Sequence, residues 1–391
     1  MSYKSNIWKM YIYKLLSNFF FISGILVPFF TDWGGISFMQ IMILQFIFVF
    51  SVFLLEVPTG AVADYLGRKT SLMLGAFSVG IAALVYSTYP NFWIFVLGEV
   101  LWALGAALMS GADEALIYDS LKKIKQEKTS KKIFGRFKSF EMAGIMIATA
   151  IGSVIAHYYG LRYSMMLIIF PLSLAFLVAL SFKEPKIKRR KHSKKYLHTL
   201  FSGIRYFRKH KILKILAFDR ISIWVLVFML IWYYQPLMQQ LGVGIIYFGF
   251  ISAGITAAQI IILNKFEFLE MFFGSKKNYL LWSALIAGVG FILMGMVTYV
   301  PVLVVLFWIV AGFGLSRQAL FQNYMNKHIE SHNRATVIST VSMLERLASG
   351  IIYLIMGILV TWSLNFAVVI TGVFIIIFAV ISRVEERHLI D

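Results

Sequence analysis

The chain has 391 residues and a formal net charge of +19, and 60% of its residues are hydrophobic while only 14% are charged. This composition excludes a soluble globular protein, because it cannot supply the polar surface that a soluble core of this size needs. The absence of cysteine excludes a disulfide framework and thiol chemistry.

Long apolar runs indicate that the chain crosses a membrane many times. Runs of about 20 residues match the ~30 Å hydrocarbon core of a bilayer, whereas a β-barrel would show alternating segments of about ten residues. We therefore predict an all-α polytopic membrane protein with twelve transmembrane helices in two six-helix bundles. The predicted helices are residues 7–30, 37–57, 70–87, 92–121, 133–159, 163–182, 212–234, 245–264, 279–299, 302–325, 335–362 and 364–381.

Loop charges predict the orientation. Lys and Arg cluster in the loops after the second, fourth, sixth, eighth and tenth helices, whereas the loops TDWGGIS, STYPN and TWSLN contain neither, and Arg162 is the exception. By the positive-inside rule, both termini are expected in the cytoplasm, and the protein in the inner or plasma membrane of a prokaryote. This placement argues against nucleic acid as a partner. The first helix lacks a small-residue cleavage site, so we expect it to be retained.

A basic segment, residues 183–211, separates the two sets of six helices. It contains the run KIKRRKHSKK, and its second half places apolar residues at helical spacing with cations between them. That pattern predicts an amphipathic helix on the anionic inner leaflet, with a solvated linker as the alternative. The predicted domains are an N-terminal bundle over residues 1–182 and a C-terminal bundle over residues 212–391.

The two bundles resemble copies of each other. The run DEAL that begins at Asp113, near the end of the fourth helix, aligns with the run RQAL that begins at Arg317, near the end of the tenth. Nearly the same shift aligns GRK at Gly67 with GSK at Gly274. A parallel repeat of six helices predicts that each half packs as a unit around a central site.

Asp113 and Arg317 occupy matching positions with opposite charge. A pseudo-twofold axis along the membrane normal would place them across from each other at the cytoplasmic side. We therefore predict a cytoplasmic gate pair that closes the inner mouth when the outer mouth is open. The alternative is that each residue pairs within its own half.

Charged residues inside the predicted helices are candidates for function, because placing one at the membrane centre costs about 2.5–3.5 kcal/mol. Glu99 lies ~12 Å into the fourth helix among apolar neighbours. Burial disfavours its anion, so Glu99 is the first candidate proton carrier, with a structural carboxyl as the alternative. Glu345, the second candidate, adjoins Arg346 at ~15 Å into the eleventh helix. Because adjacent helical side chains diverge by about 100°, each is expected to pair with another helix.

Other residues are candidates for lining a substrate cavity. Asp219, beside Arg220 in the seventh helix, is shallower, and either side chain could reach the interface by snorkelling. Asn18 is the polar residue of an aromatic and aliphatic first helix, where it either faces a cavity or bonds a neighbouring helix. The cavity candidates are Asn18, Trp102, Asp219, Trp224 and Arg346, and helix packing is the alternative role of both tryptophans.

Residues 56–72 form a polar stretch between the second and third helices. Gly60, Asp64, Gly67, Arg68 and Lys69 follow the spacing G-x-x-x-D-x-x-G-R-[KR], and the stretch resembles the loop signature of the major facilitator superfamily. A phosphate-binding P-loop is excluded, because that motif needs four residues between its glycines and a strand before it. We therefore predict a gating loop here.

The resemblance covers the whole chain and implies the 6+6 fold, in which two halves rock about a midplane site lined by helices 1, 4, 7 and 10. It places Asn18, Glu99 and Asp219 on lining helices, and Asp64 near Arg334 at the start of the eleventh helix. The stretches SGADEALIYDSL and RATVIS resemble those of prokaryotic efflux members. The fifth helix keeps the small-residue spacing of antiporters, but the proline of their signature is missing.

The predicted function is proton-coupled export of small amphipathic molecules by alternating access. One alternative is a selective importer or facilitator of a sugar, an organic anion or a lipid-like substrate, because Arg346 could bind an anion. The other is a non-transporting membrane scaffold. The sequence has no catalytic or metal-binding motif, so we predict no enzyme activity, cofactor or metal. The expected partners are a small-molecule substrate, protons and the lipid bilayer, and the expected state is a monomer.

Overall fold

The computed structural model describes residues 3–185, 205–207, 209–330 and 334–390. The run KIKRRKHSKK and most of the predicted amphipathic helix lie outside these ranges. The described residues form helices and turns without a strand, and eleven of the helices are long and apolar enough to cross a membrane. The prediction of an all-α polytopic membrane protein is therefore confirmed.

The chain forms two compact units. Unit 1 comprises residues 1–193 together with 244–253, and unit 2 comprises residues 194–243 together with 254–391. The two predicted bundles fall largely into different units, and residues 244–253 of the second bundle group with unit 1.

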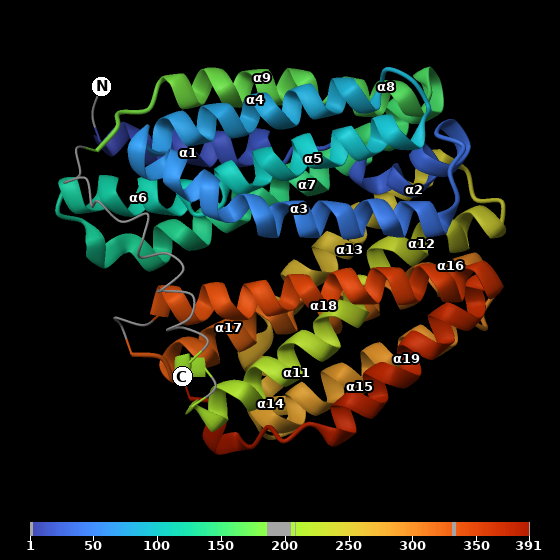
Figure 1. The fold of residues 1–391 in the computed structure, drawn as a ribbon. Coiled ribbons are helices and arrows are strands. Elements are labelled where there is room, and N and C mark those ends of the chain that lie inside the picture. Colours follow the sequence, from blue (N-terminus) through green and yellow to red (C-terminus); the bar gives the residue numbers. More distant parts are fainter. Residues whose placement is uncertain (1–2, 186–204, 208, 331–333, 391) are drawn as a thin grey trace. The chain divides into compact units, whose positions relative to one another are not determined.

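Unit 1 contains the first six predicted helices, with α4 lying between α5 and α9 (Figure 1). Its elements are α1 (Tyr3–Ser17), η1 (Ser23–Ile25), α2 (Leu26–Pro28), η2 (Phe29–Trp33), α3 (Phe38–Tyr65), α4 (Arg68–Tyr86), α5 (Phe92–Met109), α6 (Ala112–Lys123), η3 (Glu127–Thr129), α7 (Ser130–Tyr159), α8 (Leu161–Met166) and α9 (Ile169–Leu180).

Small residues let α4 and α5 approach closely. A Cβ atom on Gly75 of α4 would lie 3.0 Å from the carbonyl oxygen of Gly105, and one on Gly105 of α5 would lie 2.8 Å from that of Gly75. One turn further along, the hydroxyl of Ser78 donates to the carbonyl of Leu101 at 2.7 Å. Such backbone contact is the usual way in which membrane helices associate, because lipid offers no hydrophobic driving force between them.

The first membrane segment is interrupted, so the predicted continuous helix over residues 7–30 is wrong. α1 ends at Ser17, and the chain continues through a turn into the short elements η1, α2 and η2. The side-chain amide of Asn18 donates to the carbonyl of Lys14 at 2.9 Å, while the Asn18 backbone N–H bonds Leu15. A side chain that bonds its own backbone competes with the helical ladder, which accounts for a break here.

α3 runs further than predicted. The apolar run ends near residue 57, but the helix continues through Pro58 to Tyr65. Proline is tolerated in membrane helices because neighbouring groups satisfy the freed carbonyl. Gly60 and Asp64 therefore lie on the last turns of α3, and the predicted loop shrinks to Leu66 and Gly67.

Unit 2 contains the last six predicted helices, except that the first part of α13 groups with unit 1. α15 packs against both α16 and α19 (Figure 1). The elements are α11 (Lys211–Phe228), α12 (Leu230–Gln240), α13 (Ile245–Asn264), α14 (Phe266–Phe273), α15 (Lys276–Met294), α16 (Val300–Val310), η4 (Ala311–Leu315), α17 (Arg317–Lys327), α18 (Arg334–Trp362), α19 (Leu364–Ile381) and η5 (Glu386–His388).

Two predicted helices, 245–264 and 364–381, match α13 and α19 at both ends. Four others are divided in two. The fourth helix breaks between α5 and α6 at Gly111, whose φ of +72° few other residues adopt. The tenth is divided by the π-helical turn η4.

Candidate functional site

Glu99 lines a cavity inside unit 1. The cavity has a volume of about 190 Å³ and is enclosed by α3, α4, α5, α8 and the interrupted first segment. Glu99 is only 5% exposed, and the side-chain amide of Gln45 on α3 donates to its Oε1 at 3.1 Å. Tyr86, at the end of α4, lines the same cavity as this carboxyl. The predicted candidate is thus buried and hydrogen-bonded.

Aromatic rings surround this carboxyl. Trp102 lies three residues after Glu99 on the same face of α5, and its ring centroid is 5.0 Å from that of Phe20 and 6.1 Å from that of Tyr86. Phe30 lies 6.0 Å from Tyr86. Two of the predicted residues of the fourth helix, Glu99 and Trp102, therefore meet in one cavity. Its lining is Phe20, Ile22, Ser23, Leu26, Phe30, Gln45, Phe48, Tyr86, Glu99, Trp102 and Met165.

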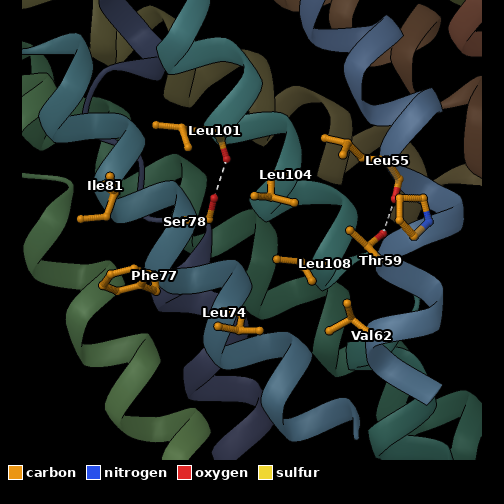
Figure 2. A pocket seen from close by; sticks show the side chains of 11 residues that line it. Leu55, Thr59, Val62, Leu74, Phe77, Ser78, Ile81, Leu101, Leu104 and Leu108 are labelled. Carbon is orange, nitrogen blue, oxygen red and sulfur yellow. Dashed lines mark hydrogen bonds between the residues drawn. The ribbon is translucent and has the colours of Figure 1, made fainter. Parts of the chain in front are cut away.

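A second cavity in unit 1, about 400 Å³ between α3, α4 and α5, is apolar (Figure 2). Its two hydroxyl groups are already engaged with the backbone. Ser78 donates to Leu101, and Thr59 donates to the carbonyl of Leu55 at 2.7 Å. Although this cavity is larger, it offers no charged group to recognise a polar substrate, so the cavity at Glu99 is the better candidate site.

The predicted gating residues organise the start of α4. Gly67 has φ +99° and precedes the helix, and the backbone N–H groups of Arg68 and Lys69 donate to the carboxylate of Glu184 at 3.0 and 2.8 Å. The Arg68 guanidinium forms an ion pair with Asp119 on α6. A carboxylate at a helix N-terminus satisfies free N–H groups and favours the helix dipole. The motif therefore ties α4 to α6 and to the segment after α9.

Unit 2 repeats this cap with a different sequence. Gly274, at φ +83°, and Ser275 precede α15, and the backbone N–H groups of Lys276 and Lys277 donate to the Glu386 carboxylate at 3.2 and 2.8 Å. Glu184 follows the sixth predicted helix and Glu386 the twelfth. The repeat predicted from GRK and GSK therefore extends to a carboxylate cap that the short alignment did not reveal.

A cluster of charges joins α1, α6 and α7 in unit 1. Lys14 Nζ lies 2.9 Å from Asp113 Oδ2 and 3.3 Å from Glu141 Oε2. Lys138, one turn before Glu141 on α7, pairs with the same carboxylate. The carboxyl of Glu114 lines the same small cavity as Lys14, Lys138 and Glu141. Lys14 thus bridges two carboxylates from different helices.

The matching cluster in unit 2 is more deeply buried. Arg317 Nη2 on α17 lies 2.5 Å from Asp219 Oδ1 on α11, and the other Asp219 oxygen accepts from Ser382. Arg220 Nη2 lies 2.9 Å from Glu345 Oε2 on α18. Asp219 and Arg220 are 4% and 7% exposed, so neither side chain uses the possibility of reaching the interface by snorkelling. Each buried charge is instead compensated by an ion-pair partner on a neighbouring helix.

The repeat is preserved with its charges reversed. In unit 1 the first helix supplies the cation, Lys14, and the fourth supplies Asp113. In unit 2 the first helix supplies Asp219 and the fourth supplies the cation, Arg317. Each member of the predicted gate pair therefore has an ion-pair partner within its own unit. That was the alternative left open from the sequence, and a bridge between Asp113 and Arg317 stays a prediction.

The remaining candidates occupy different places. Asn18 bonds the carbonyl of Lys14 and stands at the break of the first segment. Trp224 stacks on Phe228 within α11, with centroids 4.9 Å apart. Arg346 is partly buried on α18 beside Glu345, which pairs with Arg220 as expected for a partner on another helix. Asp64 is exposed on α3, and its meeting with Arg334 stays a prediction.

Sequence reasoning missed Gln45, Lys14, Glu141 and the two capping glutamates. The position of Lys14 inside the run 7–30 is a signal that it needs a partner. Glu141 gave the same signal inside the run 133–159. Gln45 gave a weak one, as a lone polar residue in an apolar helix.

Comparison with known proteins identifies this architecture as that of a membrane transporter. The protein belongs to the Major Facilitator Superfamily, whose family model matches residues 15–266. Over 114 residues the chain is 28% identical to an uncharacterized transporter of Buchnera aphidicola. That stretch is 29% of this chain and 28% of the relative, so the match spans under a third of either protein.

Solved structures share the fold over nearly the whole chain. A D-xylose-proton symporter is 14% identical with a TM-score of 0.75, covering 98% of this chain and 99% of its own. A mutant of the nucleoside transporter NupG is 12% identical with a TM-score of 0.76, covering 96% and 98%. A POT family transporter in complex with 5-aminolevulinic acid is 14% identical with a TM-score of 0.78, covering 98% and 96%. At these identities the likeness concerns the fold alone.

Proposed function

We propose that this secondary transporter exports a small amphipathic molecule in exchange for protons, and that Glu99 carries the proton. The protein would work by alternating access in a cell membrane, as a monomer with both termini in the cytoplasm. The loop charges support this orientation, and the resemblance of SGADEALIYDSL and RATVIS to efflux members supports export.

The observation that carries the proposal is the environment of Glu99. Its carboxyl is buried in a cavity lined mostly by aromatic and aliphatic side chains, and no Lys, Arg or His lines that cavity among the residues that the structure describes. A buried carboxyl without a cation is favoured in its neutral form, and it can gain or lose a proton when its surroundings change. Glu345 is a weaker candidate, because a proton there would have to break the ion pair with Arg220.

The small residues of the fifth helix do not themselves support antiport. A Cβ atom on Gly144 of α7 would lie 2.5 Å from the carbonyl oxygen of Leu15, and one on Gly152 would overlap the carbonyl of Phe21. These glycines let α7 pack closely on the first segment, which is an ordinary use of small residues in membrane helices.

Flux into proteoliposomes under an imposed pH gradient tests the proposal. Radiolabelled phenyltrimethylammonium, toluenesulfonate and xylose provide a cationic, an anionic and a neutral probe. We expect gradient-dependent flux of at least one probe, and Glu99→Gln is expected to abolish the dependence on the gradient. Glu267→Gln, on the exposed surface of α14, is the matched control and should behave as the parent protein.

A second function, a facilitator of organic anions, is favoured by a cavity of about 240 Å³ in unit 2. Arg317, Lys277 and Asp219 line it, which leaves one cation in excess. This function predicts that toluenesulfonate flux does not depend on the pH gradient and is unchanged in Glu99→Gln. The same flux should be lost in Lys277→Gln. That combination would establish the facilitator in place of proton exchange. An absence of flux for every probe would favour a scaffold.

A further inference from the structure

We propose that the cavity at Glu99 binds the cationic head of the substrate, a protonated amine or a quaternary ammonium group, in the place of the carboxyl proton. This inference rests on the proposed function and names the substrate class for the same site.

The charges around the cavity select a cation. α3 contributes Gln45 and Phe48, α4 contributes Tyr86, and α8 contributes Met165. The titratable group facing Glu99 is therefore the Tyr86 hydroxyl, and no basic side chain competes for the carboxylate among the described lining residues. A carboxylate has about four acceptor positions. The Gln45 amide occupies one of them, which leaves acceptors for an ammonium group.

The rings around the carboxyl fit the same ligand. Phe20, Tyr86 and Trp102 form a chain of contacting rings, and the cation–π contacts that the structure describes involve other rings. Aromatic faces attract a cation within about 6 Å of the ring centroid, and quaternary ammonium ligands are recognised in this way. A neutral or anionic head would leave this attraction unused, and an anion would meet the carboxylate.

The volume limits what enters. About 190 Å³ is below the ~300–1,000 Å³ of pockets that enclose drug-sized ligands. The cavity is therefore sized for a head group, and the apolar remainder of an amphipathic substrate would lie outside it.

Charge balance explains the coupling. With the proton bound, Glu99 is neutral. When the ammonium group enters, the O–H bond breaks, the proton leaves to water, and the carboxylate pairs with the cation. The cavity has no net charge in either state, so neither form leaves a buried charge unpaired.

Choline and 3,3-dimethylbutan-1-ol form a matched pair of probes, because they differ only by a carbon in place of the charged nitrogen. Calorimetry on the purified full chain in detergent measures both at pH 8. We expect choline to bind at least about tenfold more tightly than the alcohol, and to lose about tenfold in affinity for each pH unit over which Glu99 is protonated. Over the pH range in which Glu99 is protonated, one proton should be released per choline bound, read from buffers of different ionisation enthalpy.

Two variants locate the site. Glu99→Gln should remove the preference for choline over the alcohol, and Trp102→Leu should weaken choline binding more than binding of the alcohol. Glu267→Gln should bind both probes as the parent protein does. Equal affinity for the two probes in the parent protein would overturn the inference without depending on the folding of any variant, and so would choline binding that survives Glu99→Gln.

The inference and the proposed function fail separately. If flux depends on the pH gradient and is lost in Glu99→Gln, but choline and the alcohol bind equally well, the proposed function holds and the cationic substrate class is wrong. If choline binds with proton release, but flux does not depend on the pH gradient, proton-coupled transport is wrong and the cation site holds.

Discussion

Lys14 holds two carboxylates of different helices, Asp113 and Glu141, at 2.9 and 3.3 Å. Removing a partner from a buried ion pair leaves an uncompensated charge, which commonly costs about 3–5 kcal/mol. Lys14 therefore holds three helices together, because its loss would leave Asp113 without its cation and Glu141 with the exposed Lys138 alone.

Lys14→Met is expected to lower the free energy of unfolding by about 3 kcal/mol, since Asp113 and Glu141 would be left without their common cation. Thermal unfolding in detergent, followed by Trp fluorescence, measures the loss. Lys138→Met is the matched control, because the Lys138 side chain is 60% exposed and such pairs contribute little. Equal losses in both variants would contradict this account.

His388 predicts a pH-dependent contact in the C-terminal tail. Burial lowers the pKa of the imidazole, with Arg387, His328 and Lys211 adding to the effect and Glu385 opposing it. Its Nδ1 accepts from the Glu385 backbone N–H at 3.1 Å, which requires the neutral ring. The unfolded tail, with a pKa of about 6.5, therefore binds more protons in acid. Docking is fully stable above that pH and weakens as the pH falls below it.

Hydrogen exchange of residues 384–389, corrected for the intrinsic pH effect, measures this change between pH 7.5 and 5.5. We expect faster exchange at pH 5.5 in the parent protein and the same rate at both pH values in His388→Gln. A parent tail whose protection does not change with pH would rule out the effect.

At the scale of elements, the contact between α4 and α5 depends on Gly105. A Cβ atom there would lie 2.5 Å from Val79 Cγ2 and 2.8 Å from the carbonyl oxygen of Gly75. Overpacking of this kind costs about 1–3 kcal/mol. Gly135 of α7 has open space around its Cβ position.

Gly105→Ala is therefore expected to destabilise the protein by about 1–3 kcal/mol. Gly135→Ala should stabilise it by about 0.5–1 kcal/mol, because alanine loses less backbone entropy in a helix. Thermal unfolding of the two variants in the same detergent gives the comparison. A Gly105→Ala protein as stable as the parent would show that α4 and α5 can separate without cost.

The sequence predicts which segments are helical better than it predicts where they stop. α13 and α19 match because the apolar run of each is bounded by glycine or by polar residues, with Gly244 and Lys265 around α13 and Ser363 and Ser382 around α19. The break at Asn18 could not be predicted, since it depends on one side-chain bond to Lys14. The end of α3 was misplaced because Pro58 and Gly60 usually terminate helices in water, whereas a membrane helix tolerates them.

The candidate site was predictable in part for the same reason. Glu99 and Trp102 stand three residues apart, so helical geometry alone places them on one face. Gln45 and Tyr86 join them only through packing of α3 and α4 against α5. That packing depends on small residues such as Gly75 and Ser78, whose partners no single sequence identifies.

At the scale of the molecule, Asp113 has two proposed roles, the ion pair with Lys14 and the gate with Arg317. Exchanging the charges within each pair distinguishes them. If the pair with Lys14 matters, the loss of transport in Asp113→Lys should be largely restored by Lys14→Asp, which re-forms the pair with exchanged charges. If the predicted gate matters, Arg317→Asp should restore it instead. Flux of the probe that the parent protein transports, together with thermal stability, measures both rescues. Failure of both would show that the position tolerates no cation.

The two capping glutamates bear on how the chain is made. Glu184 and Glu386 each follow the last helix of their half, yet each satisfies the first N–H groups of the third helix. A ribosome delivers the earlier helix long before its cap. While each half is being synthesised, the start of α4 or α15 must therefore rely on water or lipid head groups. The arrival of one acidic residue then completes that half and marks the point at which it can close as a folding unit.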